Sequence, residues 1–238
     1  MNIHIEETHL DYLRERSIFQ TVIGSKLYGT GTEKSDTDIL YLYVESIDEL
    51  NNPFFTHHQF QIKKDGIDHI FTSVRQFCRN LILGDSSINL DVLMLTNIEE
   101  IIPPFVLVKQ EVKQVYPILK CLLGLAKRDL KLSTHRKKIN HAKRGLFCFN
   151  ALRTKGHFTK EDIQQSIQED LTKEALQDLQ KRYRTQLNED YNQGQLTKYL
   201  SASTQQTMIA YLQQLQRPTQ NQLLLKLLEA NNIKEFRY

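Results

Sequence analysis

The residues with the clearest chemical potential lie in a short stretch near the N-terminus, VIGSKLYGTGTEKSDTDILYLY, which spans residues 22–43. It contains Gly24 and Ser25 and, eleven residues beyond Ser25, two aspartates separated by one threonine, Asp36 and Asp38. Side chains at positions i and i+2 of a strand point to the same face, so these carboxylates would lie side by side. Two adjacent ionised carboxylates repel each other unless a cation lies between them. Because Mg²⁺ prefers one or two carboxylates plus substrate phosphates, the spacing predicts a metal site that handles phosphates.

The glycines of this stretch also invite comparison with known phosphate-binding loops. A Walker A loop requires G-x-x-x-x-G-K-[ST], but the residue before Lys34 is Glu33 instead of glycine. The dinucleotide pattern G-x-G-x-x-G fails as well, because Lys34 stands third after Gly31. The small backbone at Gly24, the Ser25 hydroxyl and exposed N–H groups can instead approach the terminal phosphates of a nucleotide.

Gly24-Ser25 and the Asp-x-Asp triplet before an apolar strand resemble the signature of the DNA polymerase β-like nucleotidyltransferase superfamily. The longer form GS-x-x-x-G-x-x-x-x-x-SDxD, which adds Gly29 and Ser35, is similar to the RNA-repair-associated nucleotidyltransferases of that superfamily. The resemblance implies transfer of a nucleoside monophosphate from an NTP, such as ATP, to a hydroxyl acceptor, with loss of pyrophosphate. It also implies two Mg²⁺ ions, with Mn²⁺ as an alternative. The resemblance becomes weaker after residue 43 and ends near Lys155.

The family implies a third carboxylate on a neighbouring strand, and two residues are candidates for it. Asp68 lies on an expected strand just before a helix, where the family places its third acid, and Asp91 falls where relatives often carry another acid. The order of the elements favours Asp68. The resemblance therefore implies that the catalytic and metal-binding residues are Asp36, Asp38 and Asp68, and that the nucleotide-binding residues include Gly24, Ser25 and Ser35, with Ser25 at the γ-phosphate.

A second feature is the basic segment from Lys127 to Arg144, where eight Lys or Arg stand against the single acid Asp129. Its local charge is +7, in a chain whose net charge is only +3. Such a segment attracts phosphate-bearing partners, although a solvated helix face is the ordinary alternative. At 100° per residue, Lys137, His141 and Arg144 fall on one side of a helix and the apolar residues on the other. We expect these three to bind triphosphate or an RNA backbone, and the fold to tolerate replacement of Lys137, Lys138 and Arg144.

The pattern along the chain predicts an α+β fold with two parts. Short β-branched or aromatic runs predict strands at Ile23 and over 37–44, 59–62, 67–71 and 90–95. The spacing of apolar residues predicts a helix over Val74–Leu83, capped by Thr72 or Ser73 and ended by Gly84. After Pro103 and Pro104 the strand signal disappears. We therefore expect a mixed sheet with flanking helices over 1–104 and an all-helical domain over 105–238. The resemblance implies that the first is a nucleotidyltransferase domain and that the second binds acceptor or nucleotide. Further helices are expected to start at Thr159 and Thr172 and to span 220–228.

Composition excludes several classes of protein. Hydrophobic residues make up 40% and charged residues 25% of the 238 residues, as in ordinary soluble proteins. Apolar runs are far shorter than the roughly 18 residues of a membrane span, and the N-terminus lacks the features of a signal peptide, so we expect no membrane partner and a cytoplasmic location. The three cysteines, without C-x-x-C, are expected to be reduced core residues.

The acceptor is the most open part of the sequence interpretation. The resemblance and the basic segment favour an RNA 3′ end, such as that of tRNA. A protein-nucleotidylating enzyme of the toxin or antitoxin type and a cyclic-oligonucleotide synthase are alternatives within the same class. A nucleic-acid-binding module that no longer turns over is an alternative from another class, against which the intact Ser-Asp-x-Asp argues. The sequence leaves the base and the oligomeric state open.

Overall fold

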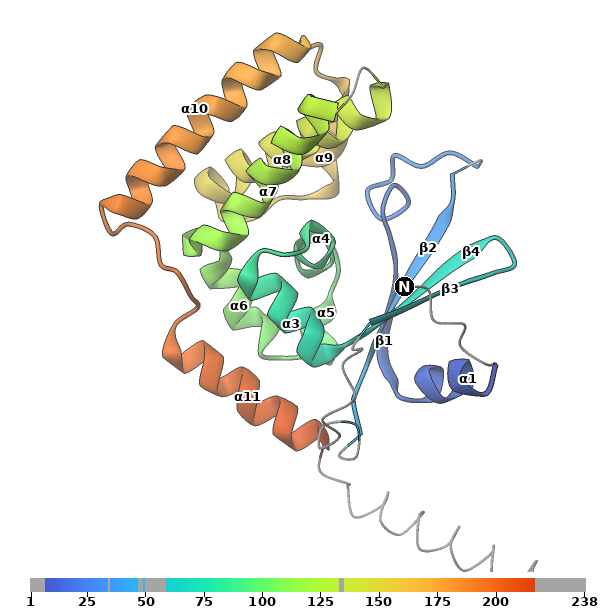
Figure 1. The fold of residues 1–238 in the computed structure, drawn as a ribbon. Coiled ribbons are helices and arrows are strands. Elements are labelled where there is room, and N and C mark those ends of the chain that lie inside the picture. The colour runs from blue at the N-terminus through green and yellow to red at the C-terminus, as the bar shows by residue number, and fades with distance from the viewer. Residues whose placement is uncertain (1–6, 34, 47–48, 50–58, 133–134, 217–238) are drawn as a thin grey trace, which may run out of the picture.

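The computed structural model describes residues 7–33, 35–46, 49, 59–132 and 135–216 and has an α+β architecture (Figure 1). Within these residues, four strands form one mixed sheet: β1 Ser17–Ile23, β2 Thr37–Tyr43, β3 Gln59–Lys64 and β4 Ile67–Ser73. Their spatial order is β1-β2-β4-β3. β1 pairs antiparallel with β2 and β3 antiparallel with β4, whereas the central strands β2 and β4 run parallel. The four predicted strands in this part of the chain are confirmed, and β1 is longer than expected.

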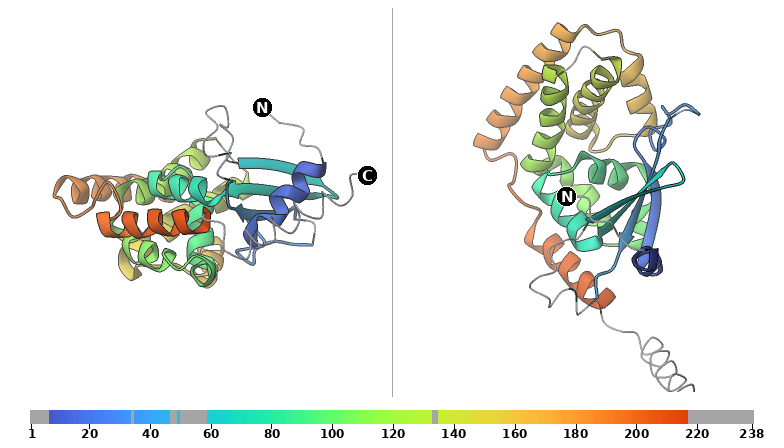
Figure 2. Two further views of the ribbon diagram at one scale, coloured as in Figure 1. Left: turned by 90° about the horizontal axis from the view of Figure 1, so that it is seen from below. Right: turned by 45° about the vertical axis from the view of Figure 1, so that its right-hand side comes forward.

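Most of the remaining described residues are helical. Figure 1 and the two views of Figure 2 show the helices from α3 onward gathered on one side of the sheet. The described helices are α1 Glu7–Glu15, α3 Val74–Leu83, α4 Ser87–Leu95, α5 Ile98–Ile101, α6 Phe105–Glu111, a 3₁₀ turn at Val112–Gln114, α7 Tyr116–Leu132, α8 Arg136–Lys155, α9 Lys160–Gln168, α10 Lys173–Asn192 and α11 Ala202–Gln216.

Alternation along β2 divides its side chains between two hydrophobic clusters. Leu40 and Leu42 belong to the large cluster that continues into the helices. Tyr41 and Tyr43 belong to a smaller cluster on the opposite face, where Leu10 and Leu13 of α1 cover the sheet. Because side chains two apart on a strand share a face, Asp38 lies on the same face as Leu40 and Leu42. The sheet therefore directs this carboxylate toward the helices.

Helix α3 has the predicted bounds, and its two ends show why. The Ser73 hydroxyl accepts a hydrogen bond from the Gln76 N–H at 3.1 Å, which caps the first turn. Gly84 ends the helix with a left-handed φ of 68°, and its N–H bonds to the carbonyls of Asn80 and Leu81. A Cβ at Gly84 would stand 2.2 Å from the Pro117 carbonyl oxygen. Glycine is therefore required there both by the turn and by the close approach of α7.

Helix α4 replaces the strand that the sequence predicts over 90–95. Ser86 caps it by accepting a hydrogen bond from the Asn89 N–H at 3.4 Å. Residues 89–93 are all buried, because α3, α5, α6, α7 and β1 pack around this short helix. Burial on every side removes the polar face that reveals a helical period, and a short apolar run is then indistinguishable from a buried strand. The strand prediction is wrong for this reason.

From α6 onward the named elements of the described residues are all helical, as expected for residues 105–238, a part called here the helical half. Pro103 and Pro104 lie in the turn between α5 and α6, and one hydrophobic cluster continues across this point, from Leu40 in the sheet to Met208 in α11. The division into domains at residue 104 therefore stays a prediction. The predicted starts at Thr159 and Thr172 are confirmed, since each caps a helix with its hydroxyl. The helix expected over 220–228 lies outside the described residues.

Two predictions about the environment of the chain can be compared with the fold. Among the described helices, none is long and apolar enough to cross a lipid bilayer. All three cysteines are free thiols, and Cys78 and Cys148 are buried as expected. Cys121 is only half-buried, and it lines the cleft described next.

Candidate active site

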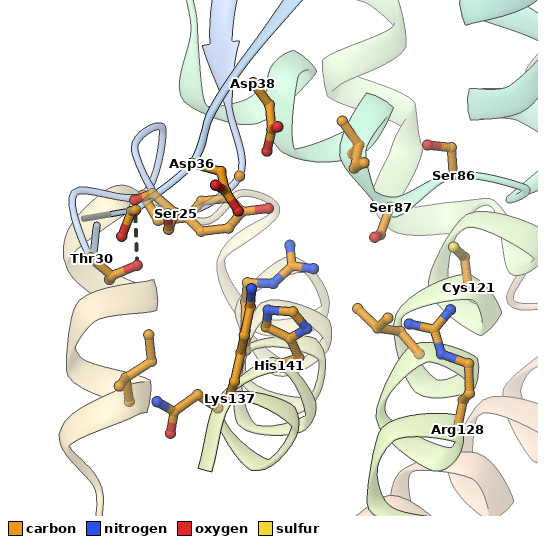
Figure 3. A pocket seen from close by; sticks show the side chains of 18 of the residues that line it. Ser25, Thr30, Asp36, Asp38, Ser86, Ser87, Cys121, Arg128, Lys137 and His141 are labelled. Atoms are coloured by element: carbon orange, nitrogen blue, oxygen red, sulfur yellow. Dashed lines mark hydrogen bonds between the residues drawn. The ribbon is translucent and has the colours of Figure 1, made fainter. Parts of the chain in front are cut away.

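A cleft of about 920 Å³ lies between the start of β2, where Asp36 and Asp38 are found, and the helices (Figure 3). Its volume falls in the range of roughly 300–1,000 Å³ that is usual for small-molecule sites. The lining comes from the loop after β1, the start of β2, the start of α4, and helices α7, α8 and α9. Of the residues predicted from the sequence, those that line it are Gly24, Ser25, Ser35, Asp36, Asp38, Lys137, His141 and Arg144. Asp68 is outside this lining.

The loop that follows β1 turns back on itself at Gly24. This residue has a left-handed φ of 67°, and a Cβ on it would stand 3.3 Å from Asp38 Oδ2. The Ser25 carbonyl accepts hydrogen bonds from the backbone N–H groups of Thr30 at 2.9 Å and Gly31 at 3.0 Å. These contacts close the loop into a compact turn and keep the backbone of Gly24 against the carboxylate. The approach of Gly24 to the terminal phosphates of a nucleotide stays a prediction.

Ser35 contributes to the loop through its hydroxyl. Its Oγ accepts a hydrogen bond from the Thr32 N–H at 2.9 Å, and its own N–H donates to the Thr32 carbonyl at 2.9 Å. Gln164 of α9 donates from Nε2 to the Tyr28 carbonyl at 3.1 Å, which fixes the middle of the loop from the helical side. Ser35 thus shapes the loop immediately before Asp36. Its predicted contact with nucleotide stays a prediction.

The three predicted carboxylates gather at one end of the sheet. Asp36 precedes β2 and is exposed, Asp38 is the second residue of β2, and Asp68 is the second residue of β4. In the parallel pairing of β2 with β4, Asp38 stands directly opposite Asp68. Burial raises the pKa of Asp38, and the negative charges of Asp68 and Asp36 raise that pKa further. The sheet therefore brings two further carboxylates close to Asp38.

The donor set of this end of the sheet can be tested against a divalent cation. Within the described residues, no three His, Cys, Asp or Glu side chains are placed so that they hold a metal ion by themselves. Two cleft-lining carboxylates, Asp36 and Asp38, nevertheless fit Mg²⁺, which is usually bound through one or two carboxylates plus the phosphates of a substrate. A cation bound between the two carboxylates would relieve the like-charge repulsion at Asp38.

The opposite wall of the cleft is basic. Lys137 and His141 extend from α8 toward the side of the cleft where Asp36 and Asp38 lie, and Arg128 lines the cleft from α7 (Figure 3). Arg136 lines it as well, and Arg128, Arg136 and Lys137 are exposed. Burial lowers the pKa of His141, and the Arg144 charge lowers that pKa further, while Asp129 raises it. The start of β2 thus offers two carboxylates to the cleft, and helices α7 and α8 offer basic side chains.

Asp91, the alternative to Asp68 as the third carboxylate, lies in a different setting. Its side chain is fully buried in α4 and forms an ion pair with Arg144 Nη1 of α8. The Tyr28 hydroxyl donates a hydrogen bond to the same oxygen, Oδ2, at 2.6 Å, and the Arg144 guanidinium lies 4.8 Å from the centre of the Tyr28 ring. Burial raises the pKa of Asp91, while Arg144 and the Tyr28 hydrogen bond oppose that rise. These contacts make Asp91 a link between the loop, α4 and α8.

The same contacts change the interpretation of Arg144. Only 7% of its side chain is exposed, so it does not share the exposure of Lys137 on the same helix. We therefore revise the expectation that the fold tolerates its replacement, because removal would leave Asp91 buried without its cation. Lys143 is buried too and donates to the Ile167 carbonyl at 3.4 Å, near the end of α9. Helical periodicity indicates on which side of α8 a residue lies, but it does not show which other elements pack over that side.

Several cleft residues were missed from the sequence as members of a site. Arg128 and Arg136 carry a signal, since both belong to the basic segment. Ser86 and Ser87 lie at the start of α4, which was taken for a strand. Cys121 has no sequence signal for this position, and burial raises its pKa to about 11, so it is not a thiolate nucleophile at neutral pH.

Comparisons of the chain with known protein families, with curated proteins and with solved structures find no match.

Proposed function

We propose that this protein is a metal-dependent nucleotidyltransferase that moves a nucleoside monophosphate from an NTP to a hydroxyl acceptor. The observation that carries the proposal is the pairing of Asp38 with Asp68 on parallel strands, beside Asp36 and opposite a basic wall. The loop between β1 and β2 contains Gly24-Ser25, whose resemblance to the motif of polymerase β-like enzymes suggested the activity. A polyphosphate bound with Mg²⁺ matches both walls of the cleft, because its cation suits the carboxylates and its phosphates suit the cations.

Each group has a defined task in this proposal. Asp36 and Asp38 would hold the Mg²⁺ that accompanies the triphosphate, and Asp68 adds negative charge next to Asp38. Ser25 and the Gly24 backbone approach the terminal phosphate, while Lys137 and Arg136 attract the triphosphate from α8. Bound Mg²⁺ would neutralise charge that develops during in-line phosphoryl transfer and orient the reacting oxygens. Leaving pyrophosphate would depart along the basic wall.

RNA, with tRNA foremost, is the acceptor that the charge of the helical half favours. Arg128, Arg136 and Lys137 are exposed at the cleft, and Lys127 and Lys131 are exposed on α7. Cations clustered in this way neutralise backbone phosphates and bring a polyanion to the site. If the acceptor were a protein hydroxyl or a second nucleotide, the positive charge would not need to extend beyond the site that binds the NTP.

The proposal can be tested by incubating the protein with Mg²⁺, each α-labelled NTP in turn and total tRNA. We expect label from one or a few NTPs to enter RNA and pyrophosphate to be released. Asp36→Asn combined with Asp38→Asn should lower the rate on the order of a thousandfold, because several kcal/mol of transition-state stabilisation depend on the metal. The rate with Mn²⁺ in place of Mg²⁺ shows whether that ion is an alternative.

A matched control removes two exposed carboxylates outside the cleft lining, through Asp11→Asn and Asp65→Asn. It should leave the rate within about twofold of wild type, because surface substitutions of this kind are mild. Full activity of the Asp36 and Asp38 double variant would contradict the proposal. Label that enters protein, or a cyclic nucleotide, would keep the chemistry and replace the acceptor.

A further inference from the structure

Asp129 is a buried carboxylate surrounded by basic side chains at the junction of α7 and α8. Its side chain is 0% exposed, and its Oδ1 receives the Arg128 Nε at 3.0 Å. The Lys138 Nζ lies 3.6 Å from the same oxygen, and the His141 Nδ1 lies 3.6 Å from Oδ2. Arg128 belongs to α7, whereas Lys138 and His141 belong to α8. One carboxylate therefore contacts basic groups of two helices.

Two of these three basic groups line the cleft. Arg128 and His141 are both among its lining residues, and Figure 3 shows them on neighbouring helices of the same wall. The exposed fraction of the side chain is 58% for Arg128 and 39% for His141, so each combines a buried partner with access to the cleft. Asp129 itself does not line the cleft within the described residues.

The energetics of this arrangement favour a functional explanation. A buried ion pair is weak evidence for stability, because desolvation offsets most of the attraction. Within the described residues, Asp129 Oδ2 accepts no hydrogen bond, so the carboxylate is not optimally satisfied as a structural group. Asp129 is also the single acid in a segment with eight basic residues. Its geometry suits the fixing of cations better than the strengthening of the helix pair.

We propose that Asp129 is a positioning residue that holds Arg128 and His141 on the cleft wall, where they contact the phosphates of the nucleotide. Arg128 uses Nε for Asp129, and its guanidinium has further donors for a phosphate oxygen. A cation whose side chain is already ordered loses less conformational entropy when it binds an anion. This inference rests on the proposed function, and it adds Arg128 to the phosphate-binding residues.

A positioning role and simple charge neutralisation predict opposite results. If Asp129 only neutralises its neighbours, Asp129→Asn makes the wall more positive and tightens binding of a polyanion. If Asp129 positions Arg128 and His141, the same change releases both side chains and weakens binding despite the added positive charge. The sign of the change in affinity therefore distinguishes the two roles.

The experiment measures binding of inorganic tripolyphosphate to the full chain by calorimetry, without metal and without acceptor. We expect Asp129→Asn to weaken binding about tenfold, the effect of losing roughly one charge-assisted hydrogen bond, and Asp129→Glu to recover part of that loss. The matched control is Asp190→Asn, which breaks the ion pair between Asp190 of α10 and Arg153 of α8, outside the cleft lining. It should leave tripolyphosphate affinity unchanged. For NTP, Asp129→Asn should raise KM more than it lowers kcat.

Arg128→Ala keeps the inference falsifiable if Asp129→Asn folds poorly, because unchanged tripolyphosphate binding by Arg128→Ala would overturn it; where both variants fold, they form a double-mutant cycle. Arg128→Ala alters an exposed side chain and should weaken tripolyphosphate binding as well, and addition of Asp129→Asn to it should cost less than Asp129→Asn alone. Unchanged or tighter binding by Asp129→Asn, or full additivity in the cycle, would overturn the positioning role while leaving the proposed function intact. Absence of both tripolyphosphate and NTP binding in the wild type would overturn the proposed function itself.

Discussion

Aspartate side chains occur in two contrasting settings on either side of the cleft. At the end of the sheet, Asp38 faces two other carboxylates, and within the described residues none of the three forms an ion pair. In the helical half, Asp91 and Asp129 are both fully buried, and each faces at least one Arg. In the first setting the carboxylates repel one another, and the charges of Lys137 and Lys63 oppose this only in part; in the second, Asp91 and Asp129 each have a cationic partner.

This difference shows how the same residue type offers accessible charge in one place and holds neighbouring basic groups in another. Repelling carboxylates at an accessible edge destabilise the free protein and are stabilised when a cation arrives. Buried carboxylates with fixed cationic partners instead define how helices and loops sit against one another. The contrast predicts that substitutions at the sheet affect turnover and that substitutions at Asp91 or Arg144 affect folding.

The largest effect on stability is expected from Arg144→Ala. It should lower the free energy of unfolding by about 3–5 kcal/mol, because Asp91 is left as a buried charge without its partner. Urea denaturation measures this change. Arg136→Ala, an exposed position on the same helix, is the matched control and should change stability by no more than about 0.5 kcal/mol. Wild-type stability of Arg144→Ala with loss of nucleotide binding would instead assign Arg144 to the ligand.

An intermediate effect is expected from Asp68→Asn. It should lower kcat by roughly 10- to 100-fold, in line with the loss of a group that supports a metal ligand, and leave KM for NTP nearly unchanged. Single-turnover kinetics separate the two quantities. Asp65→Asn is the matched control, since Asp65 lies in the adjoining turn with a φ of 52° that asparagine also adopts. A greater loss of kcat in Asp91→Asn than in Asp68→Asn, at equal folded fraction, would contradict this prediction and assign the third carboxylate to Asp91.

The smallest effect concerns the salt dependence of RNA binding. Each phosphate of a single strand that is neutralised contributes about −0.7 to the slope of log K against log salt. Replacement of Arg136 and Lys137 by Ala should therefore flatten the slope by about 1.4. Lys181→Ala with Arg182→Ala, exposed on α10 and outside the cleft lining, should leave the slope unchanged. Salt-insensitive turnover without RNA binding by the wild type would exclude RNA as the acceptor.

Local signals in the sequence were sufficient for much of the fold. The bounds of α3 follow from apolar spacing and two caps, and the starts of β2, β3 and β4 coincide with the predicted runs. The same signals failed at α4, whose period is hidden by burial on all sides. Short-range patterns thus predicted α3 and these strands, whose two faces differ, and failed at α4, whose sides are all buried.

For the candidate site, sequence reasoning found the residues of the sheet more readily than those of the helices. Gly24, Ser25, Asp36 and Asp38 lie within fifteen positions of one another, so their spacing alone brings them to one loop. The partners of Asp91 and Asp129 depend on how α4, α7 and α8 pack, which no local spacing specifies. Whether a Lys or Arg faces solvent or a buried acid is decided by this packing.

The bond between Gln164 and the Tyr28 carbonyl has a consequence for the order in which the protein is made. The two residues are 136 positions apart, and the bond fixes the loop that begins at Gly24. During synthesis the N-terminal sheet leaves the ribosome well before α9. The loop therefore gains its contact with α9 only when most of the described helical half has been translated. A nascent chain that carries only the sheet has the sequence of the loop without this restraint on its shape.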